Sequence, residues 1–142
     1  MKLNKGSYLL LIKIKKPVEI KIGSLGRRRF EKGYYVYVGS AMNNLKKRVE
    51  RHMNTSESKK GRDKKYWHID YLLSNRDVFI ENVYYKESEE KEECKIARDI
   101  SKFSRVTEDK FGSSDCKCES HLFKTNKKEP EKNLEGFKKL KP

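Results

Sequence analysis

The sequence is poor in cysteine and has no long apolar run, and each scarcity excludes a class of protein. Three cysteines among 142 residues are too few for the disulfide framework of a small secreted domain, so we expect free thiols in a reducing compartment. The longest aliphatic run, residues 9–12, is far shorter than the roughly 20 residues that cross a bilayer. Residues 1–5 lack the apolar stretch of a signal peptide. We therefore predict a cytoplasmic protein without a membrane segment.

Acidic residues are too few to balance the basic ones. The chain has 21 Asp and Glu residues against 35 Lys and Arg residues, which gives a formal net charge of +14. A one-sided surplus of this size favours a polyanionic partner such as nucleic acid, whereas a merely charged surface gains both signs. The length suits one domain with a single core.

Short strand patterns dominate the first forty residues. Residues 6–14 are rich in strand-forming side chains, and residues 18–22 alternate apolar with charged side chains. Residues 34–38 form a third strand pattern, in which residues 35–38 alternate Tyr with Val. The connections between them are too short for parallel crossovers, so we expect an antiparallel arrangement.

Helical patterns alternate with two further strands in the rest of the chain. We predict helices from residue 43 or 44 to 53, at 65–73 and at 89–103, a strand at 78–86 and a short strand at 122–123. The predicted fold is a small α+β domain over residues 1–125, in which a mixed, mainly antiparallel sheet is flanked by helices. Residues 126–142 form a basic, partly disordered tail.

One segment combines groups that handle phosphate. The strand that ends in Tyr37-Val38-Gly39 is followed by a helix with Arg48 and His52 four residues apart, on one face. A phenol at a strand end, beside a guanidinium and an imidazole, can hold a phosphate and move a proton.

With Gly6-Ser7-Tyr8 on an earlier strand, these residues resemble the GIY-YIG nuclease superfamily. A wider resemblance, covering most of residues 6–123, is to a small prokaryotic branch carried as a domain of unknown function and sometimes fused to an endonuclease III-type DNA glycosylase. Two departures stand out: the gap between Tyr8 and Tyr37 is longer than usual, and one additional residue lies between Gly39 and Leu45.

The resemblance implies a metal-dependent endonuclease that hydrolyses phosphodiester bonds in DNA, in repair or on structured DNA. In this reading Tyr8 or Tyr37 activates water with His52, and Arg48 binds the scissile phosphate. A glutamate on a later helix holds one Mg²⁺ or Mn²⁺ ion.

Glu93 is the glutamate that the sequence favours for this ion, ahead of Glu90. It adjoins Cys94, which is expected to face inward, and it lies one turn before Ala97 on the packing face of the predicted helix.

Basic residues surround the motif and predict sequence-independent affinity for a phosphate backbone. The chosen contact residues are Arg27, Arg28, Arg29, Lys46, Lys47, Arg51, Lys59 and Lys60. DNA is the expected partner, RNA is the alternative, and the resemblance adds a DNA glycosylase-type repair enzyme as a protein partner.

Four further residues are expected to support the site: Gly39, His68, Asp70 and Asp115. The group Cys116, Cys118 and His121, with His68 or Cys94 as a fourth member, also invites a structural zinc reading. Cysteine pairs in zinc sites usually have two or more residues between them, so we favour a loop packed near the active site instead.

The sequence is also compatible with two functions other than a nuclease. The first is a catalytically silent nucleic-acid-binding module that positions a partner repair enzyme, and the second is a structural protein whose charge keeps it soluble. Binding alone does not require Tyr8 or His52, which favours the nuclease over the module. The clustering of basic residues disfavours the structural protein.

Overall fold

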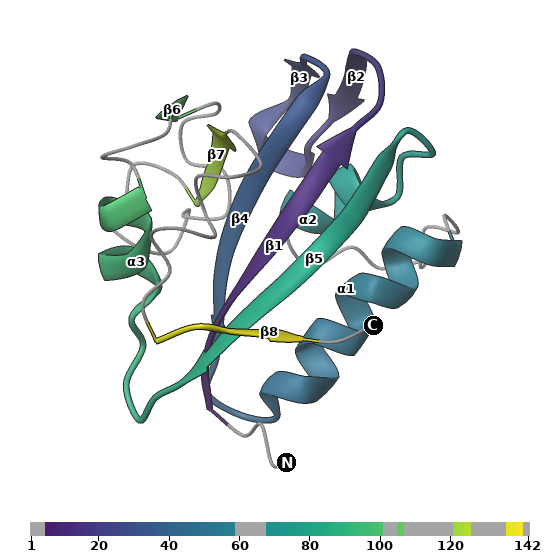
Figure 1. Cartoon of the computed structure of the whole chain (residues 1–142). Helices are drawn as coiled ribbons and strands as arrows, with labels where there is room; N and C mark the ends of the chain where they lie inside the picture. The colour runs from purple at the N-terminus through teal and green to yellow at the C-terminus, as the bar shows by residue number, and fades with distance from the viewer. Residues whose placement is uncertain (1–4, 59–67, 101–104, 107–120, 126–135, 141–142) are drawn as a thin grey trace.

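A computed structural model of the chain describes residues 5–58, 68–100, 105–106, 121–125 and 136–140. These residues form a small α+β domain (Figure 1), as the sequence predicts. Its main sheet has six strands in the order β6-β7-β4-β1-β5-β8, and all the pairings recorded for it are antiparallel. The strands are β1 (Gly6–Ile14), β4 (Gly33–Ala41), β5 (Val78–Glu87), β6 (Arg105–Val106), β7 (Leu122–Thr125) and β8 (Lys138–Leu140).

The central strand β1 is buried on both faces, which explains its uninterrupted apolar sequence. Every second side chain of β1, such as Leu10 and Ile12, points to one face of the sheet. There it packs in a core with residues of helices α1 (Leu45–Ser58) and α2 (His68–Leu73). Side chains of the other set, Leu9 and Leu11, join the core on the opposite face, under α3 (Glu93–Ile100). Among the described residues, no helix has the length and apolar content that a bilayer crossing requires.

A separate two-stranded hairpin, β2 (Val18–Lys21) and β3 (Arg27–Phe30), continues the core on the α1 face. The single turn η1 (Gly23–Leu25) lies between the two strands. Val18 and Phe30 are buried, while Arg27 and Arg29 point to solvent. The hairpin lies at the end of the sheet where β1 ends and β4 begins (Figure 1).

Three boundaries differ from the sequence-based expectation. Helix α1 extends to Ser58, five residues past its predicted end at residue 53. Helix α3 begins at Glu93 and not at Glu89, because the preceding residues form a turn in which the Ser88 hydroxyl donates to the Glu90 carbonyl at 2.8 Å. In the C-terminal tail, β8 pairs with β5, and Phe137 packs against the α3-side core. The domain's sheet therefore includes residues that the sequence assigned to the tail.

Candidate active site

Tyr8 and His52 meet inside the α1 side of the core. The Tyr8 Oη atom lies 2.8 Å from His52 Nε2, and the two side chains are 1 % and 0 % exposed. Tyr37, 5 % exposed, completes a triangle whose ring centroids lie 5.4 Å apart for Tyr8–His52 and 6.4 Å apart for the other two pairs. The structure thus brings together three predicted residues from β1, β4 and α1.

Gly39 makes this contact possible. Gly39 is the direct partner of Tyr8 in the β1–β4 register, so both positions face α1. A Cβ atom at Gly39 would lie 2.4 Å from both Cζ and Oη of Tyr8. The Tyr8 ring therefore occupies the space that any other residue at position 39 would fill, which gives the Tyr-Val-Gly motif a physical reason.

Arg48 lies one helical turn before His52 and is only partly buried. Its Nη1 atom donates to the Ser40 carbonyl at 3.3 Å, which draws the guanidinium to the end of β4. Asn44 begins the helix, since its Oδ1 atom accepts a hydrogen bond from the Lys47 amide at 3.1 Å. We refer to Tyr8, Tyr37, Arg48 and His52 as the quartet.

A pocket of about 590 Å³ opens on the outer side of the quartet, and Arg48 is the member that lines it. The size is within the range of small-ligand sites. Its lining residues include Asn43, Asn44, Lys47, Arg48, Glu50, Arg51 and Asn54. Even with Arg51 paired to Asp70, the cations Lys47 and Arg48 outnumber the one carboxylate of the lining, Glu50, which suits an anionic ligand.

Arg51 and Asp70 form a bidentate ion pair between α1 and α2. The Nη1 and Nη2 atoms of Arg51 lie 2.9 Å and 3.1 Å from the two carboxylate oxygens of Asp70, whose side chain is 3 % exposed. The sequence assigned Arg51 to nucleic-acid binding and Asp70 to a supporting role. In the structure Asp70 compensates the Arg51 charge, and the pair fixes the two helices together.

Burial keeps His52 neutral. Desolvation is the main cause that lowers the pKa of His52 from 6.5 to about 3. The Asp70 carboxylate raises this pKa, while the Arg48 and Arg51 guanidinium groups lower it. At neutral pH the imidazole therefore meets the Tyr8 hydroxyl uncharged.

This pKa predicts a stability that depends on acidity. Because the unfolded His52 protonates below pH 6.5 and the folded one only near pH 3, the free energy of unfolding falls as the pH drops through that window. The expected slope is up to about 1.4 kcal/mol per pH unit from this group. Urea unfolding of the wild type and His52→Gln at pH 7, 6 and 5 measures it. The variant should show the shallower decline, and equal declines in both proteins would contradict the pKa.

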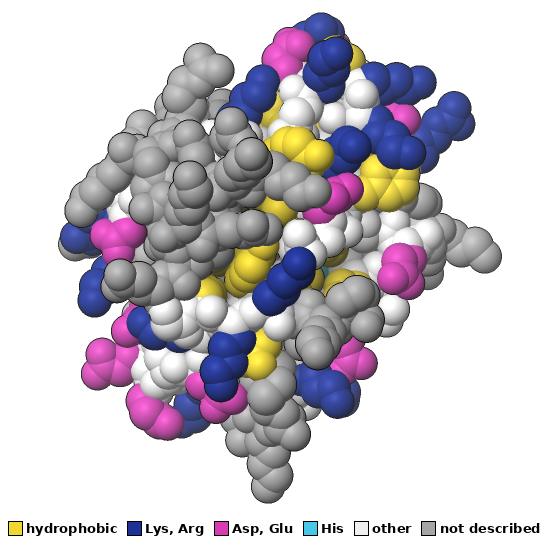
Figure 2. Space-filling view, in the orientation of Figure 1, with side chains coloured by type: hydrophobic (Ala, Val, Ile, Leu, Met, Phe, Trp, Pro, Cys, Tyr) yellow, Lys and Arg dark blue, Asp and Glu magenta, His cyan; other side chains and the backbone are white. Residues whose placement is uncertain are grey.

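The predicted basic residues of the hairpin lie far from the quartet. The two regions are separated by the six residue-to-residue steps of β1 from Tyr8 to Ile14, which is about 20 Å along the strand. Arg27 pairs with Glu19 at 3.4 Å and Arg29 with Glu31 at 2.9 Å, both on the exposed surface. Figure 2 shows Lys and Arg side chains gathered over this end of the molecule. The hairpin is thus a second basic region and does not flank the quartet.

The remaining predicted contact and support residues divide into two groups. Lys46 and Lys47 are exposed in the first turn of α1, beside Arg48, and His68 begins α2. Lys59, Lys60 and Asp115 lie outside the described residues.

Glu93 is the first residue of α3, and its side chain is outside what the structure describes. The apolar face of α3 packs on the sheet face opposite α1, so backbone topology places this helix and the Tyr8–His52 contact on different sides of the sheet. Within the described ranges, no group of three His, Cys, Asp or Glu side chains could hold a metal ion. Asp70 is committed to Arg51. The described residues alone do not fit a metal at the quartet.

The prediction of three free thiols is wrong, because Cys94 is disulfide-bonded in the structure. Its Sγ atom also lies 3.9 Å from Nε2 of His121, which is 1 % exposed. Cys116 and Cys118 are outside the described residues, so the zinc hypothesis has no described ligand set.

Sequence reasoning missed four pocket residues: Asn43, Asn44, Glu50 and Asn54. The helical spacing of Glu50 and Asn54 could have predicted that they lie beside Lys47 and Arg51. Lys47 and Arg51, like Glu50 and Asn54, are four residues apart, so both pairs lie on the outward face of α1.

Comparison with known proteins gives one match. A family model described as domain of unknown function DUF123 matches residues 7–140. No curated protein and no solved structure matches the chain.

Proposed function

The chain belongs to the DUF123 family of domains of unknown function, and from this premise we propose that it is a cytoplasmic endonuclease of the GIY-YIG type that hydrolyses phosphodiester bonds in DNA. The observation that carries the proposal is the 2.8 Å contact between Tyr8 Oη and His52 Nε2, one helical turn from a partly exposed arginine. A core that needed only apolar contacts would gain nothing from placing a phenol, an imidazole and a guanidinium together.

Arg48 is the group proposed to touch the scissile phosphate. It lines the basic pocket, and its planar guanidinium offers several donors to phosphate oxygens. As negative charge grows on those oxygens during hydrolysis, a fixed cation beside them stabilises the transition state more than the ground state.

Tyr8 and His52 are proposed to move the proton. A neutral imidazole whose Nε2 atom carries no hydrogen accepts the Tyr8 hydroxyl hydrogen bond, and the phenolic oxygen can then take a proton from the attacking water as its own passes to His52. The Arg48 charge lowers the pKa of His52 in the free protein. A phosphate bound to Arg48 compensates that charge, so substrate binding raises the basicity of His52.

A second candidate function has its own supporting observation. Tyr8, Tyr37 and His52 are at most 5 % exposed, so a phosphate in the pocket meets Arg48 and not the other three. This burial favours the nucleic-acid-binding module, in which the aromatic groups only brace the Arg48 helix.

The metal and the protein partner are separate proposals that rest on the family resemblance. We propose Glu93 as the ligand of one Mg²⁺ or Mn²⁺ ion, on the resemblance alone, since α3 packs on the sheet face opposite the Tyr8–His52 contact. A DNA glycosylase-type repair enzyme is the proposed partner. No step in the proton transfer above is routed through the ion.

A cleavage assay separates the two candidate functions. Labelled duplex, nicked, flapped and branched DNA and single-stranded RNA are incubated with the protein and Mg²⁺ or Mn²⁺, beside Glu93→Ala. Arg76→Ala removes a cation at the distant end of the molecule and serves as the matched control. We expect DNA cleavage by the wild type and Arg76→Ala, and little by Glu93→Ala. Salt-sensitive binding without cleavage under either metal supports the module, and the absence of binding rejects both.

Lys46 and Lys47 give a prediction about affinity. Both are exposed beside Arg48, so the double substitution Lys46→Ala/Lys47→Ala should weaken DNA binding. If each contacts one phosphate, the slope of log affinity against log salt becomes shallower by about 1.8. Fluorescence anisotropy across a salt series measures it, with Lys32→Ala as a charge control at the far end of the sheet. An unchanged slope would place the nucleic acid elsewhere.

A further inference from the structure

Three polar residues form a row across the central strands on the face that α3 covers. Ser7 of β1 is the direct partner of Ser40 on β4 and of Lys86 on β5. Directly paired residues point to the same side of a sheet. Ser7 alternates with Leu9 of the α3-side core, which identifies that side.

The two hydroxyl groups in this row are buried. Ser7 is 0 % and Ser40 is 9 % exposed, and neither Oγ atom has a hydrogen-bond partner among the residues that the structure describes. A buried hydroxyl without a hydrogen bond destabilises a fold, and such groups are uncommon in native proteins. Residues that cost stability in this way are expected where they meet a ligand.

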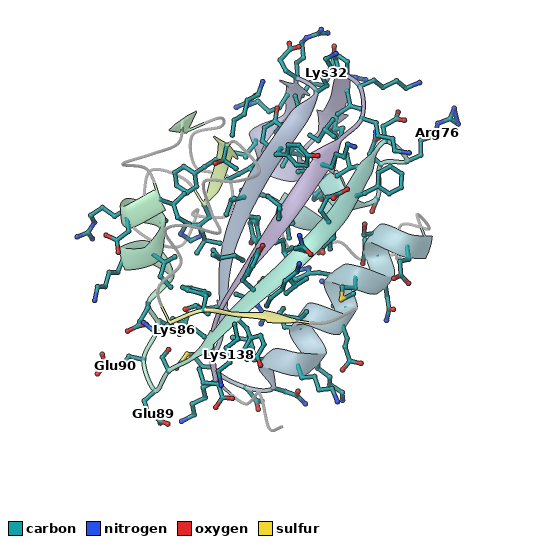
Figure 3. The ribbon with its side chains drawn as sticks, in the orientation of Figure 1. Lys32, Arg76, Lys86, Glu89, Glu90 and Lys138 are labelled. Carbon is teal, nitrogen blue, oxygen red and sulfur yellow. The ribbon has the colours of Figure 1, made fainter. Side chains whose placement is uncertain are left out.

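The third member of the row supplies a positive charge. Lys86 Nζ lies 3.6 Å from Glu92 Oε1, and the side chains are 40 % and 27 % exposed. An ion pair this long and this accessible is weak, so an anion can displace Glu92 from it. Figure 3 shows Lys86 and Lys138 together at the lower end of the sheet, away from Lys32 and Arg76.

The row lies beside the proposed scissile phosphate. Arg48 donates to the carbonyl of Ser40, the same residue whose hydroxyl belongs to the row. The guanidinium approaches this end of β4 from the α1 side, and the hydroxyl projects on the α3 side. A nucleic-acid strand that passes the end of the sheet can thus present one phosphate to Arg48. The hydroxyls are at most 9 % exposed, so the neighbouring phosphate reaches them only when the Lys86–Glu92 pair opens.

We propose that Ser7, Ser40 and Lys86 bind a phosphate oxygen of the substrate next to the one held by Arg48. The two hydroxyls donate to the oxygen, and the ammonium group neutralises its charge after Glu92 moves away. Two hydroxyls beside an ammonium suit an anion and not a cation. The assignment to nucleic acid rests on the proposed function, while the anion site itself does not.

The test uses stability and binding on the same variants. In phosphate-free buffer, Ser7→Ala and Ser40→Ala should raise Tm by about 3 °C, because each removes a buried hydroxyl that has no partner in the described part of the chain. Ser56→Ala is the matched control: Ser56 is 5 % exposed, and its Oγ atom accepts a hydrogen bond from the Ile80 amide at 3.3 Å, so loss of this hydroxyl should lower Tm.

Inorganic phosphate should raise the Tm of the wild type and Ser56→Ala more than that of Ser7→Ala. The affinity of Ser7→Ala for labelled DNA should fall about tenfold.

The outcomes distinguish this inference from the proposed function. If Ser7→Ala and Ser40→Ala lower Tm and respond to phosphate and DNA as the wild type does, a structural water bonds the hydroxyls and the inference fails, even where the wild type cleaves DNA. If both variants gain stability and lose the phosphate response while the wild type cleaves nothing, the anion site stands and the nuclease proposal fails. If Ser7→Ala loses both the rise of Tm with phosphate and its affinity for DNA, the site binds the nucleic-acid backbone. Loss of the phosphate response with unchanged DNA affinity overturns that assignment.

Discussion

Arg48→Ala is expected to lower the single-turnover rate of DNA cleavage by about 100-fold to 1,000-fold, the effect of removing one fixed donor from a transition-state anion. Arg48 is partly exposed, and its hydrogen bond to the Ser40 carbonyl is long, at 3.3 Å. Because a partly exposed side chain adds little to the core, its removal should change Tm far less than it changes the rate. The loss belongs to the chemical step because the guanidinium gains interaction as the phosphate gains charge.

Two comparisons make the Arg48 result specific. Arg48→Lys keeps the charge but loses the planar donor set, so we expect its rate to fall between the wild type and Arg48→Ala. Arg76→Ala removes the same charge at the opposite end of the molecule and should cleave at the wild-type rate. Cleavage by Arg48→Ala at the wild-type rate would remove the quartet from the reaction.

Gly39→Ala is expected to lower the free energy of unfolding by about 3 kcal/mol, at the upper end of the usual cost of overpacking. The new methyl group would lie 2.4 Å from Tyr8 Cζ and Oη, and 2.9 Å from Cε1. The ring cannot swing into solvent, since it is 1 % exposed and its hydroxyl is held by His52. Strand β4 or the Tyr8 side chain must shift.

A double-mutant cycle tests this cause by urea denaturation. In the Tyr8→Ala background the space beside position 39 is empty, so Gly39→Ala should cost much less there than in the wild type. The same cost in both backgrounds would show that the penalty comes from the β4 backbone and not from the Tyr8 ring.

Much of the fold follows from local pattern. The strand-forming run of β1 and the spacing of Leu45, Val49 and His52 on α1 predict elements that the structure contains. Periodicity also places His52 on the inward stripe, where it is 0 % exposed.

Other elements depend on distant contacts that leave no local signal. In β3 three consecutive arginines precede the one buried residue, Phe30, so the pattern indicates a basic turn. The lysine-rich β8 is a strand only because β5 offers it an edge. The acidic residues from Glu89 onward are typical of the first turn of a helix. In the structure Ser88 donates a hydrogen bond to the Glu90 carbonyl, and α3 begins only at Glu93.

Some contacts in the candidate site also follow from local spacing in the sequence, and others do not. Arg48 and His52 share a helix face, so their proximity can be read from spacing alone. Contact between Tyr8 and His52, 44 residues apart, was implied only by the family resemblance. The Arg51–Asp70 pair joins two helices, and neither residue type signals the other. Which face of the sheet α3 covers is a property of the whole fold.

The most direct measurement follows binding and cleavage of end-labelled DNA by the wild-type protein in one sample, with anisotropy reporting the complex and a denaturing gel reporting the strands. We expect salt-sensitive binding, then conversion of the DNA to shorter strands when Mg²⁺ or Mn²⁺ is added, and no conversion with a chelator. DNA that is bound yet remains intact under both metals would contradict a nuclease and leave a nucleic-acid-binding module.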